Sequence, residues 1–543
     1  MDKRITMNYS ISNLLIYINK YAYPIIFILF ALWMCVGIFP LMCYEGDSNE
    51  VILGCEILYH HGWQFPPEYC YEYRMQPLTV ITIVVLKHIL PFLTCEQIYC
   101  LLSTISSFIF LIGSIEFAQH ITKYSRTKIL IAAILLPEMY AIAMYPNSAI
   151  LAATCFIWAF INIIKNRHWA AILLMCIAPL FRIDVVIVYP AILPLLLLVG
   201  KTWKKSIIFS AIYCTIIVIV VFLLFLLFKA DVISTFEGYQ KWNEIINIRM
   251  VIIAIFGFYS ITYFILLPIG IIRIGKQKSW KELFLVLMPI ILLHFIYSSM
   301  GCAAKHYLYI APFVIIAGVR GFAWICDIGQ RKMWVKWLIL LAIVLILIAS
   351  VRINKPNRPG FKQKLIISIF SKDISDYRLS VGIGAGQTVP TQDEMMLASG
   401  QLLYPWYIQS FKKELSISNK RIKKTIDSLP TSDIVFIDWG IRVPVLSEYM
   451  KEHNSVRYHQ NNEAFTVSNA KRCLTIRLDE NYNGDKDSFW RQTKAYCLSL
   501  HRKNVYIITP NLRSQLYFDS ISQETDIKKV AEMLYKINIS NIR

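Results

Sequence analysis

The sequence predicts a polytopic α-helical membrane protein with about 11 transmembrane helices and a C-terminal α/β domain outside the cytoplasm. Composition is the first reason, because 56% of the 543 residues are apolar and 17% are charged, against about 45–50% and about 25% in an average soluble domain. The second is a mean hydropathy of +0.51, and the third is a series of long apolar segments that ends near Val351. Together these observations exclude a disordered chain, a nucleic-acid-binding arm and an ordinary cytosolic enzyme.

Of the net charge of +20, residues 353–543 carry +9 and residues 1–352 carry +11, most of it in short clusters of Lys and Arg between the apolar segments. Such clusters collect in cytoplasmic loops, so they indicate topology and not a nucleic-acid partner. If every cluster is cytoplasmic, the segments between them cross the membrane in pairs, which leaves the N-terminus inside and the C-terminal domain outside. The spans predicted in this way are 22–44, 97–119, 129–145, 147–164, 169–181, 184–200, 205–228, 251–272, 282–299, 307–324 and 333–352.

The loop 44–76, which follows the first span, is acidic and aromatic. Its only basic residue is Arg74, and its six carboxylates are Glu45, Asp47, Glu50, Glu56, Glu68 and Glu72. An acidic loop is typical of an outside segment, so solvation accounts for most of these charges. Asp47 comes so soon after the first span that we expect it at the membrane surface. Residues 49–61 have helical periodicity up to Gly62 and predict a short amphipathic helix on the bilayer.

The next apolar segment, 77–93, does not fit the pairing of spans. It contains Lys87 and His88, and Pro91 lies close to its end. Counting it as a crossing would place most of the later basic clusters outside. We therefore expect an interfacial or partly inserted helix.

Three further groups of polar residues lie beside outer ends of the predicted spans. Arg182 and Asp184 stand at the turn between two short spans, Lys305-His306-Tyr307 begins the tenth span, and the loop 229–249 carries several charges. Ionisable groups at membrane depth are costly, so they pair or serve a function. Arg182 and Asp184 either pair with each other or belong to a site, and Lys305 is either a site residue or a snorkelling anchor.

A carboxylate on one side and cations on the other suit one kind of chemistry at this surface. The carboxylate can accept a proton from a hydroxyl nucleophile. Lys, His and Arg can hold a lipid phosphate and stabilise the charge that develops as it leaves. The pattern therefore predicts group transfer from a polyprenyl-phosphate donor outside the cytoplasm.

The chain changes character after residue 352, so we divide it into a membrane domain, 1–352, and a soluble α/β domain, 353–543. In the second part, strands are expected at 379–383, 433–438, 464–467, 474–478 and 504–509. Helices are expected at 392–403, 419–428, 443–453, 487–502 and 525–537. The glycines of 381–386 lack the spacing of a dinucleotide-binding loop and indicate a tight turn.

The order of residues in the loop 44–76 resembles that of the C-type glycosyltransferases (the GT-C superfamily), multi-spanning enzymes that use lipid-phosphate-linked sugars. The matching residues are Glu45-Gly-Asp47, then Gly62-Trp63, then Tyr71-Glu72-Tyr73-Arg74, then Pro77-Leu78. Most similar are the dolichyl- or polyprenyl-phosphate-mannose mannosyltransferases and the bacterial lipid A glycosyltransferases. Residues 305–312 are similar to a late Arg/Lys-aromatic-x-x-Pro-x-x-Pro element of this family, with His306 at the aromatic position and Tyr309 at the first proline.

The resemblance implies a GT-C-like fold and a single displacement that inverts the anomeric carbon. It implies that Asp47 is the general base, with Glu45 and Glu50 as rivals for that role. The donor phosphate would be bound by Lys305, His306 and Arg182. The sugar or acceptor would be oriented by Glu72, Arg74, Gln76, Asp184 and Tyr307.

The resemblance also implies partners and a compartment. The donor would be a polyprenyl-phosphate sugar, the acceptor a lipid, glycan or protein, and the location a bacterial inner membrane. No cofactor is expected, although clustered carboxylates could hold a divalent cation, as in the oligosaccharyltransferase branch of the superfamily. The C-terminal domain would cover the active site or help to bind the acceptor.

Two other classes of membrane protein remain alternatives. A polytopic transporter would show internal repeats and paired broken helices, which we do not detect in the sequence. A lipid-linked glycan polymerase or ligase needs essential arginines in a large late loop, and a membrane acyltransferase needs an embedded histidine. His294 is the only candidate for such a histidine, and the pattern around it favours a packed core residue.

Overall fold

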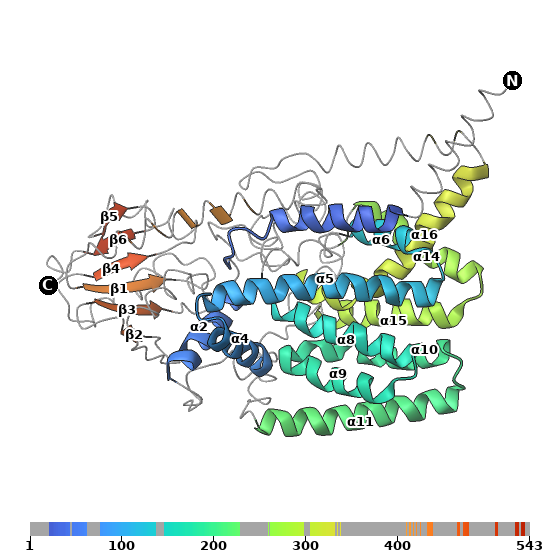
Figure 1. The fold of residues 1–543 in the computed structure, drawn as a ribbon, viewed down its shortest axis with the longest axis horizontal. Coiled ribbons are helices and arrows are strands. Elements are labelled where there is room, and N and C mark those ends of the chain that lie inside the picture. Colours follow the sequence, from blue (N-terminus) through green and yellow to red (C-terminus); the bar gives the residue numbers. More distant parts are fainter. Residues whose placement is uncertain are drawn as a thin grey trace.

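The chain folds into a bundle of apolar helices and a separate six-stranded sheet (Figure 1). The computed structural model describes residues 21–43, 46–61, 76–136, 146–227, 259, 261–297, 304–331, 334, 337, 409, 412–413, 416–417, 420, 424, 432–437, 464–466, 471–476, 505–508, 527–531 and 534–537. We call the end of the bundle nearer to the sheet the sheet end, and the opposite end the basic end.

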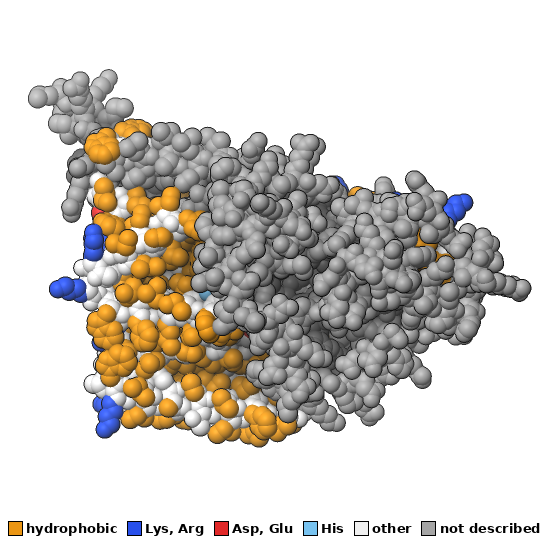
Figure 2. Space-filling view, turned by 180° about the vertical axis from the view of Figure 1, so that it is seen from behind, with side chains coloured by type: hydrophobic (Ala, Val, Ile, Leu, Met, Phe, Trp, Pro, Cys, Tyr) orange, Lys and Arg blue, Asp and Glu red, His pale blue; other side chains and the backbone are white. Residues whose placement is uncertain are grey.

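Three described helices are long and apolar enough to cross a bilayer: α5 (Cys95–Thr122), α11 (Trp203–Leu227) and the Ala311–Ile328 part of α16 (Ala311–Arg331). Around them lie the first helix, Tyr21–Val36, and α6 (Arg126–Ile134), α8 (Ser148–Ile164), α9 (His168–Phe181), α10 (Ile192–Leu198), α14 (Ile261–Lys276) and α15 (Trp280–Tyr297). Apolar side chains cover the exposed face of the described bundle (Figure 2). Water disfavours an apolar surface of this extent, so the chain is an integral membrane protein.

Most predicted spans coincide with described helices, and the segment 184–200 is a correction. It forms a 3-10 helix, η3 (Ile183–Ala191), followed by the short α10, instead of one α-helix. Pro190 lies inside η3 and Pro194 inside α10. Proline has no backbone N–H to donate to the preceding turn, so a continuous α-helix is disfavoured there. Residues 137–145 of the predicted span 129–145, the first part of 251–272 and most of 333–352 lie outside the described residues.

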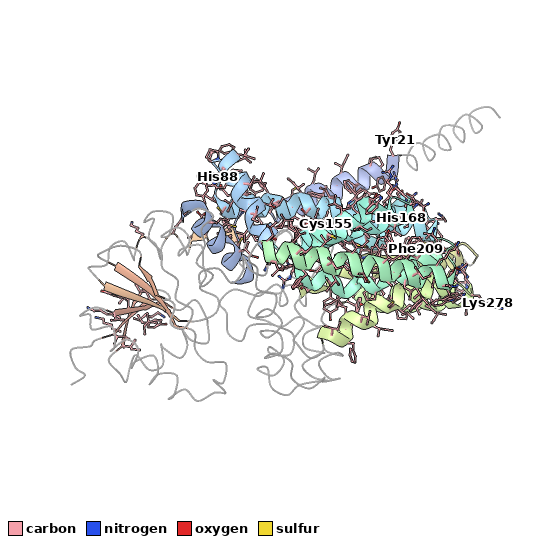
Figure 3. All side chains as sticks on the ribbon, turned by 90° about the horizontal axis from the view of Figure 1, so that it is seen from below. Tyr21, His88, Cys155, His168, Phe209 and Lys278 are labelled. Carbon is pink, nitrogen blue, oxygen red and sulfur yellow. The ribbon has the colours of Figure 1, made fainter. Side chains whose placement is uncertain are left out.

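The connections rich in Lys and Arg gather at the basic end, where Figure 2 shows their side chains along one edge. His168 and Lys278 lie toward this end, and His88 lies nearer to the sheet (Figure 3). Glu116, near the end of α5, joins two of the connections by pairing with Arg126 at 2.9 Å and with Lys165 at 3.2 Å. The described helices α5 and α6, α8 and α9, α10 and α11, and α14 and α15 are therefore linked at one side of the bundle, as the pairing of spans predicts.

Residues 46–61 form a helix at the sheet end, α2 (Gly46–His61), which includes the predicted 49–61. Its apolar residues Val51, Ile52, Cys55 and Leu58 are buried, but against protein and not against a bilayer. They pack on α5 and on α4 (Pro77–Ile89), which supplies Val80, Ile83 and Val84 to the same cluster. The expectation that this helix lies on the bilayer is therefore wrong for its apolar face. At 13 residues, α4 is also too short to cross a hydrocarbon core of about 30 Å at about 1.5 Å per residue.

The sheet has the strand order β2-β3-β1-β4-β6-β5. Its parallel centre is β3 (Lys471–Ile476), β1 (Ser432–Ile437) and β4 (Val505–Ile508). Antiparallel strands flank it: β2 (Ala464–Thr466) pairs with β3, and β6 (Leu534–Ile537) pairs with β4 and with β5 (Ile527–Ala531). The strands predicted near 433, 464 and 504 are confirmed, and β3 begins three residues before its prediction. The elements predicted at 379–383, 392–403, 443–453 and 487–502 lie outside the described residues.

The predicted helix 525–537 is wrong, because this segment forms the hairpin of β5 and β6. Its apolar residues recur every three to four positions, which is helical spacing. However, pairing with β4 buries Leu534, Tyr535 and Ile537 against the sheet. Tertiary pairing of β-branched and aromatic residues outweighs local periodicity here.

Candidate functional site

A buried triad of polar side chains lies where α9 ends and η3 begins. Arg182, the C-cap of α9, donates from Nε to Oδ2 of Asp184 at 2.9 Å. Tyr309, the last residue of η4 (Ala304–Tyr309), donates its hydroxyl to Oδ1 of the same carboxylate at 2.6 Å. Arg182 is 9% exposed and Asp184 is 7% exposed. The expected pairing of Arg182 with Asp184 is therefore confirmed.

The first turn of α8 contacts this triad. Nη1 of Arg182 is 3.5 Å from Oγ of Ser148, the first residue of α8. Asn147 caps the helix, because its Oδ1 accepts a hydrogen bond from the backbone N–H of Ala149 at 2.7 Å. The backbone N–H of Asn147 donates to Oγ of Ser103 on α5 at 3.2 Å. The cap thus fixes the start of α8 against α5 and presents Ser148 to Arg182.

The beginnings of α2 and α4 are fastened to the same place. Ser48, directly after Asp47, donates its hydroxyl to the carbonyl of Pro146, two residues before Ser148. Thr79 in the first turn of α4 donates to the carbonyl of Phe181 at 3.2 Å. Gln76, the buried N-cap of α4, lies three residues before Thr79. First turns of α2, α4, α8 and η3 therefore converge on residues 146–148 and 181–184.

This convergence has an electrostatic consequence. The first turn of a helix carries unsatisfied N–H groups and the positive end of the helix dipole, which attract anions. Several first turns beside the Arg182 guanidinium favour a phosphate-like group over a cation. The Asp184 carboxylate offsets part of the positive charge of Arg182 and keeps the guanidinium in one orientation.

Tyr307, also on η4, joins the site to a stack of aromatic rings. Its ring meets that of His294 edge-on at 5.2 Å between centroids, and the ring of Tyr259 stacks on that of His294 at 6.0 Å. Nδ1 of His294 lies 2.7 Å from the carbonyl of Ile290, one turn earlier in α15. His294 is therefore a packed core histidine, as its surroundings in the sequence suggest.

The other predicted site residues are described in part. Asp47 and Glu50 lie in α2, and Lys305 and His306 lie in η4, which packs against α8, η3 and α16. Only the backbone of these four residues is described, and Glu45, Glu72 and Arg74 lie outside the described residues. The structure thus brings the elements that carry Asp47, Gln76, Arg182, Asp184, Lys305 and Tyr307 to one end of the bundle.

Ser48 and Ser148 were not predicted as site residues. Ser148 follows Pro146-Asn147, and an Asn before an apolar helical segment is a recognised N-cap signal. That signal predicts where α8 begins, but not that the first turn of α8 faces Arg182. Such a contact depends on how helices distant in the sequence pack together.

Comparison with known proteins gives a match in fold only. No protein-family model matches the sequence, and no curated protein matches it significantly. Among solved structures, ArnT from Cupriavidus metallidurans bound to undecaprenyl phosphate is similar, with a TM-score of 0.54, 12% sequence identity, and coverage of 95% of this chain and 98% of that chain. ArnT from the same organism in the apo state has a TM-score of 0.52 and 11% identity, and covers 96% of this chain and 98% of its own. The chain therefore has a fold similar to that of ArnT over nearly its whole length.

Proposed function

We propose that the chain is a membrane glycosyltransferase that moves a sugar from a polyprenyl-phosphate-linked donor to an acceptor hydroxyl. The observation that carries the proposal is the convergence of helix first turns on buried Arg182 at the sheet end of an apolar bundle. Such a place can hold a phosphate whose hydrocarbon chain extends along the lipid-facing helices. The ArnT structure of the same fold contains undecaprenyl phosphate, a ligand of this chemical class.

The proposed reaction is a single displacement at the anomeric carbon. The acceptor hydroxyl loses its proton to the carboxylate of Asp47 as its oxygen bonds to the sugar. The bond between the sugar and the phosphate oxygen breaks, and polyprenyl phosphate leaves with the electron pair. Attack opposite the leaving group inverts the anomeric carbon. Glu45 and Glu50 are the alternative bases.

The residues proposed to hold the donor phosphate are Arg182, Lys305 and His306. Negative charge develops on the phosphate oxygen as its bond to the sugar breaks. Preorganised cations therefore stabilise the transition state more than they stabilise the bound donor. Gln76, Asp184 and Tyr307 lie on the same elements and are proposed to orient the substrates, together with Glu72 and Arg74. This mechanism needs no metal ion.

We further propose that the basic end of the bundle is cytoplasmic and the sheet end extracytoplasmic. The Lys and Arg side chains of the described connections gather at the basic end, as the positive-inside rule requires of cytoplasmic loops. The membrane is proposed to be a bacterial inner membrane, and the acceptor a lipid, glycan or protein. The C-terminal domain, 353–543, then lies on the side of the proposed chemistry, where it can bind the acceptor.

The proposal is tested with purified protein and a panel of polyprenyl-phosphate sugars. Release of polyprenyl phosphate that requires both donor and acceptor is the expected result. No release with any donor in the panel, from protein that is folded and monodisperse, would contradict it.

The role of Asp47 is tested by Asp47→Asn, which keeps the size of the side chain but removes the base. We expect transfer to fall by at least about a hundredfold, as for the loss of a general base, while membrane insertion and thermal stability stay unchanged. The matched controls Glu45→Gln and Glu50→Gln are expected to retain most activity. Near-normal transfer by Asp47→Asn, with loss in one of the controls, would reassign the base.

A further inference from the structure

One lysine of the C-terminal part of the chain is buried against the helix bundle. Lys412 is 1% exposed, and its Nζ donates to the backbone carbonyl of Ile38 at 3.3 Å. Ile38 lies just beyond the first helix, 374 residues earlier in the sequence. The next residue, Lys413, belongs to the same helical segment and is exposed. One ammonium is therefore inserted into the bundle while its neighbour stays outside.

The surroundings of Lys412 include one acidic residue and two thiols. Burial lowers the pKa of the Lys412 ammonium, and its interactions with Cys100, Cys43 and Glu96 act in the opposite direction. Cys43 is fully buried and Cys100 is 3% exposed. These groups belong to two different elements, because Cys43 follows the first helix whereas Glu96 and Cys100 lie in the first turns of α5.

Glu96 links this lysine to the chain just before α2. Its Oε1 accepts a hydrogen bond from the backbone N–H of Cys43 at 2.6 Å. Lys412 itself binds the carbonyl of Ile38, so the two contacts bracket residues 38–43. Asp47 follows Cys43 by four residues, in the first turn of α2. The backbone that leads into α2 is thus held at Ile38 by Lys412 and at Cys43 by Glu96.

A buried ammonium is costly unless carbonyls or carboxylates compensate for the lost water. Its contacts are therefore specific, because few other positions in a bundle offer a carbonyl and a carboxylate together. An apolar side chain of similar length would fill the same space but would not select residues 38–43 as its partner.

We propose that Lys412 is a positioning residue that docks the C-terminal part of the chain on residues 38–43 and so holds Asp47 at the site. This inference rests on the proposed function for the role of Asp47. The docking itself does not depend on it. Lys412 touches no substrate in this account and acts through the backbone ahead of α2.

The docking is tested by the reactivity of Cys43 in the full-length protein. N-ethylmaleimide modification of Cys43, measured by mass spectrometry, should be at least about tenfold faster in Lys412→Met than in the parent, because local opening then costs less. The matched control Lys413→Met should react at the parental rate. Equal reactivity of Cys43 in all three proteins would overturn the docking.

The positioning role is tested by steady-state kinetics of sugar transfer. We expect Lys412→Met to lower kcat by about tenfold or more while the KM for the donor stays unchanged, since misplacing a reacting group costs rate more than binding. Lys412→Arg, which keeps a cation, should recover part of kcat, and Lys413→Met should match the parent. Faster labelling of Cys43 with an unchanged kcat would overturn the positioning role.

If Lys412→Met does not fold, the double variant Glu96→Gln with Lys412→Met removes both charges and serves in its place, because neither partner is left as an unpaired buried charge. If the parent transfers no sugar from any donor, the proposed function fails, and the labelling of Cys43 still decides whether Lys412 docks the C-terminal part.

Discussion

At the scale of single residues, the site depends on the carboxylate of Asp184, which accepts hydrogen bonds from both Arg182 and Tyr309. An ion pair this deeply buried stabilises the protein only while both partners are present. Its value for function is orientation, because the guanidinium is held toward Ser148 and the start of α8. The pair therefore determines the direction in which a cation is offered to an anionic substrate.

Removing one partner of this pair should be costly. Asp184→Asn leaves the buried Arg182 guanidinium without its counter-charge, and we expect a loss of about 3–5 kcal/mol. Tyr309→Phe removes one hydrogen bond to a charged acceptor and should cost about 1.5–3 kcal/mol. Thermal unfolding of the two variants in the same detergent gives the order of the effects. A Tyr309→Phe variant that unfolds at a lower temperature than Asp184→Asn would show that the ion pair is not the main contribution.

The sequence indicates the pair of Arg182 and Asp184, but not the other residues that bind it. Arg182 and Asp184 are conspicuous because two ionisable residues stand between two apolar spans, and their separation by two positions makes pairing plausible. The partners Ser148 and Tyr309 lie 34 and 125 positions away. No local pattern reports contacts at such a distance, since they result from the packing of α8 and η4 against η3.

At the scale of elements, the bundle depends on close approach between α14 and α16. A Cβ atom added at Gly270 would overlap the backbone carbonyl of Ala317, and one added at Gly321 would overlap that of Leu266. Lipid provides no hydrophobic driving force between helices, so association in a membrane relies on such close packing of small residues. η4 and α16 follow one another, so this contact also determines where η4 presents Tyr307 and Tyr309.

A methyl group is enough to test this packing. Gly270→Ala should lower the temperature of thermal unfolding clearly, because the backbones of α14 and α16 must separate to accept the Cβ atom. Gly275→Ala is the matched control on the same helix, with nothing within 4 Å of its added Cβ atom. It should be neutral or stabilising by up to about 1 kcal/mol through helix propensity. Equal unfolding temperatures for the two variants would contradict the packing.

Elements were predictable where one local pattern dominates. The helix predicted at 49–61 follows from apolar periodicity, and α2 ends at His61 as expected. The sequence could not show that α4 and α5 cover its apolar face, because a bilayer and a protein surface demand the same residues. In the segment 525–537 the periodicity was misleading, since pairing with β4 determines the structure.

At the scale of the whole molecule, charge is separated along the bundle. The Lys and Arg clusters of the described connections lie at the basic end, and the triad, the start of α2 and the buried Lys412 lie at the sheet end. Composition and the spacing of basic clusters were sufficient to predict a polytopic membrane protein, whereas the expected fold came from the resemblance of the loop 44–76 to a known family. We therefore expect the donor phosphate to bind at the sheet end and not among the numerous cations of the basic end.

That claim is tested most directly by photo-crosslinking with an undecaprenyl phosphate analogue that carries its reactive group beside the phosphate. Mass spectrometry of the crosslinked peptides identifies the residues in contact with the head group. We expect crosslinks in peptides that contain residues 146–148 and 181–184, and unlabelled undecaprenyl phosphate should compete with them. Competed crosslinks confined to residues 201–205 and 273–281 would place the phosphate at the basic end and contradict the account.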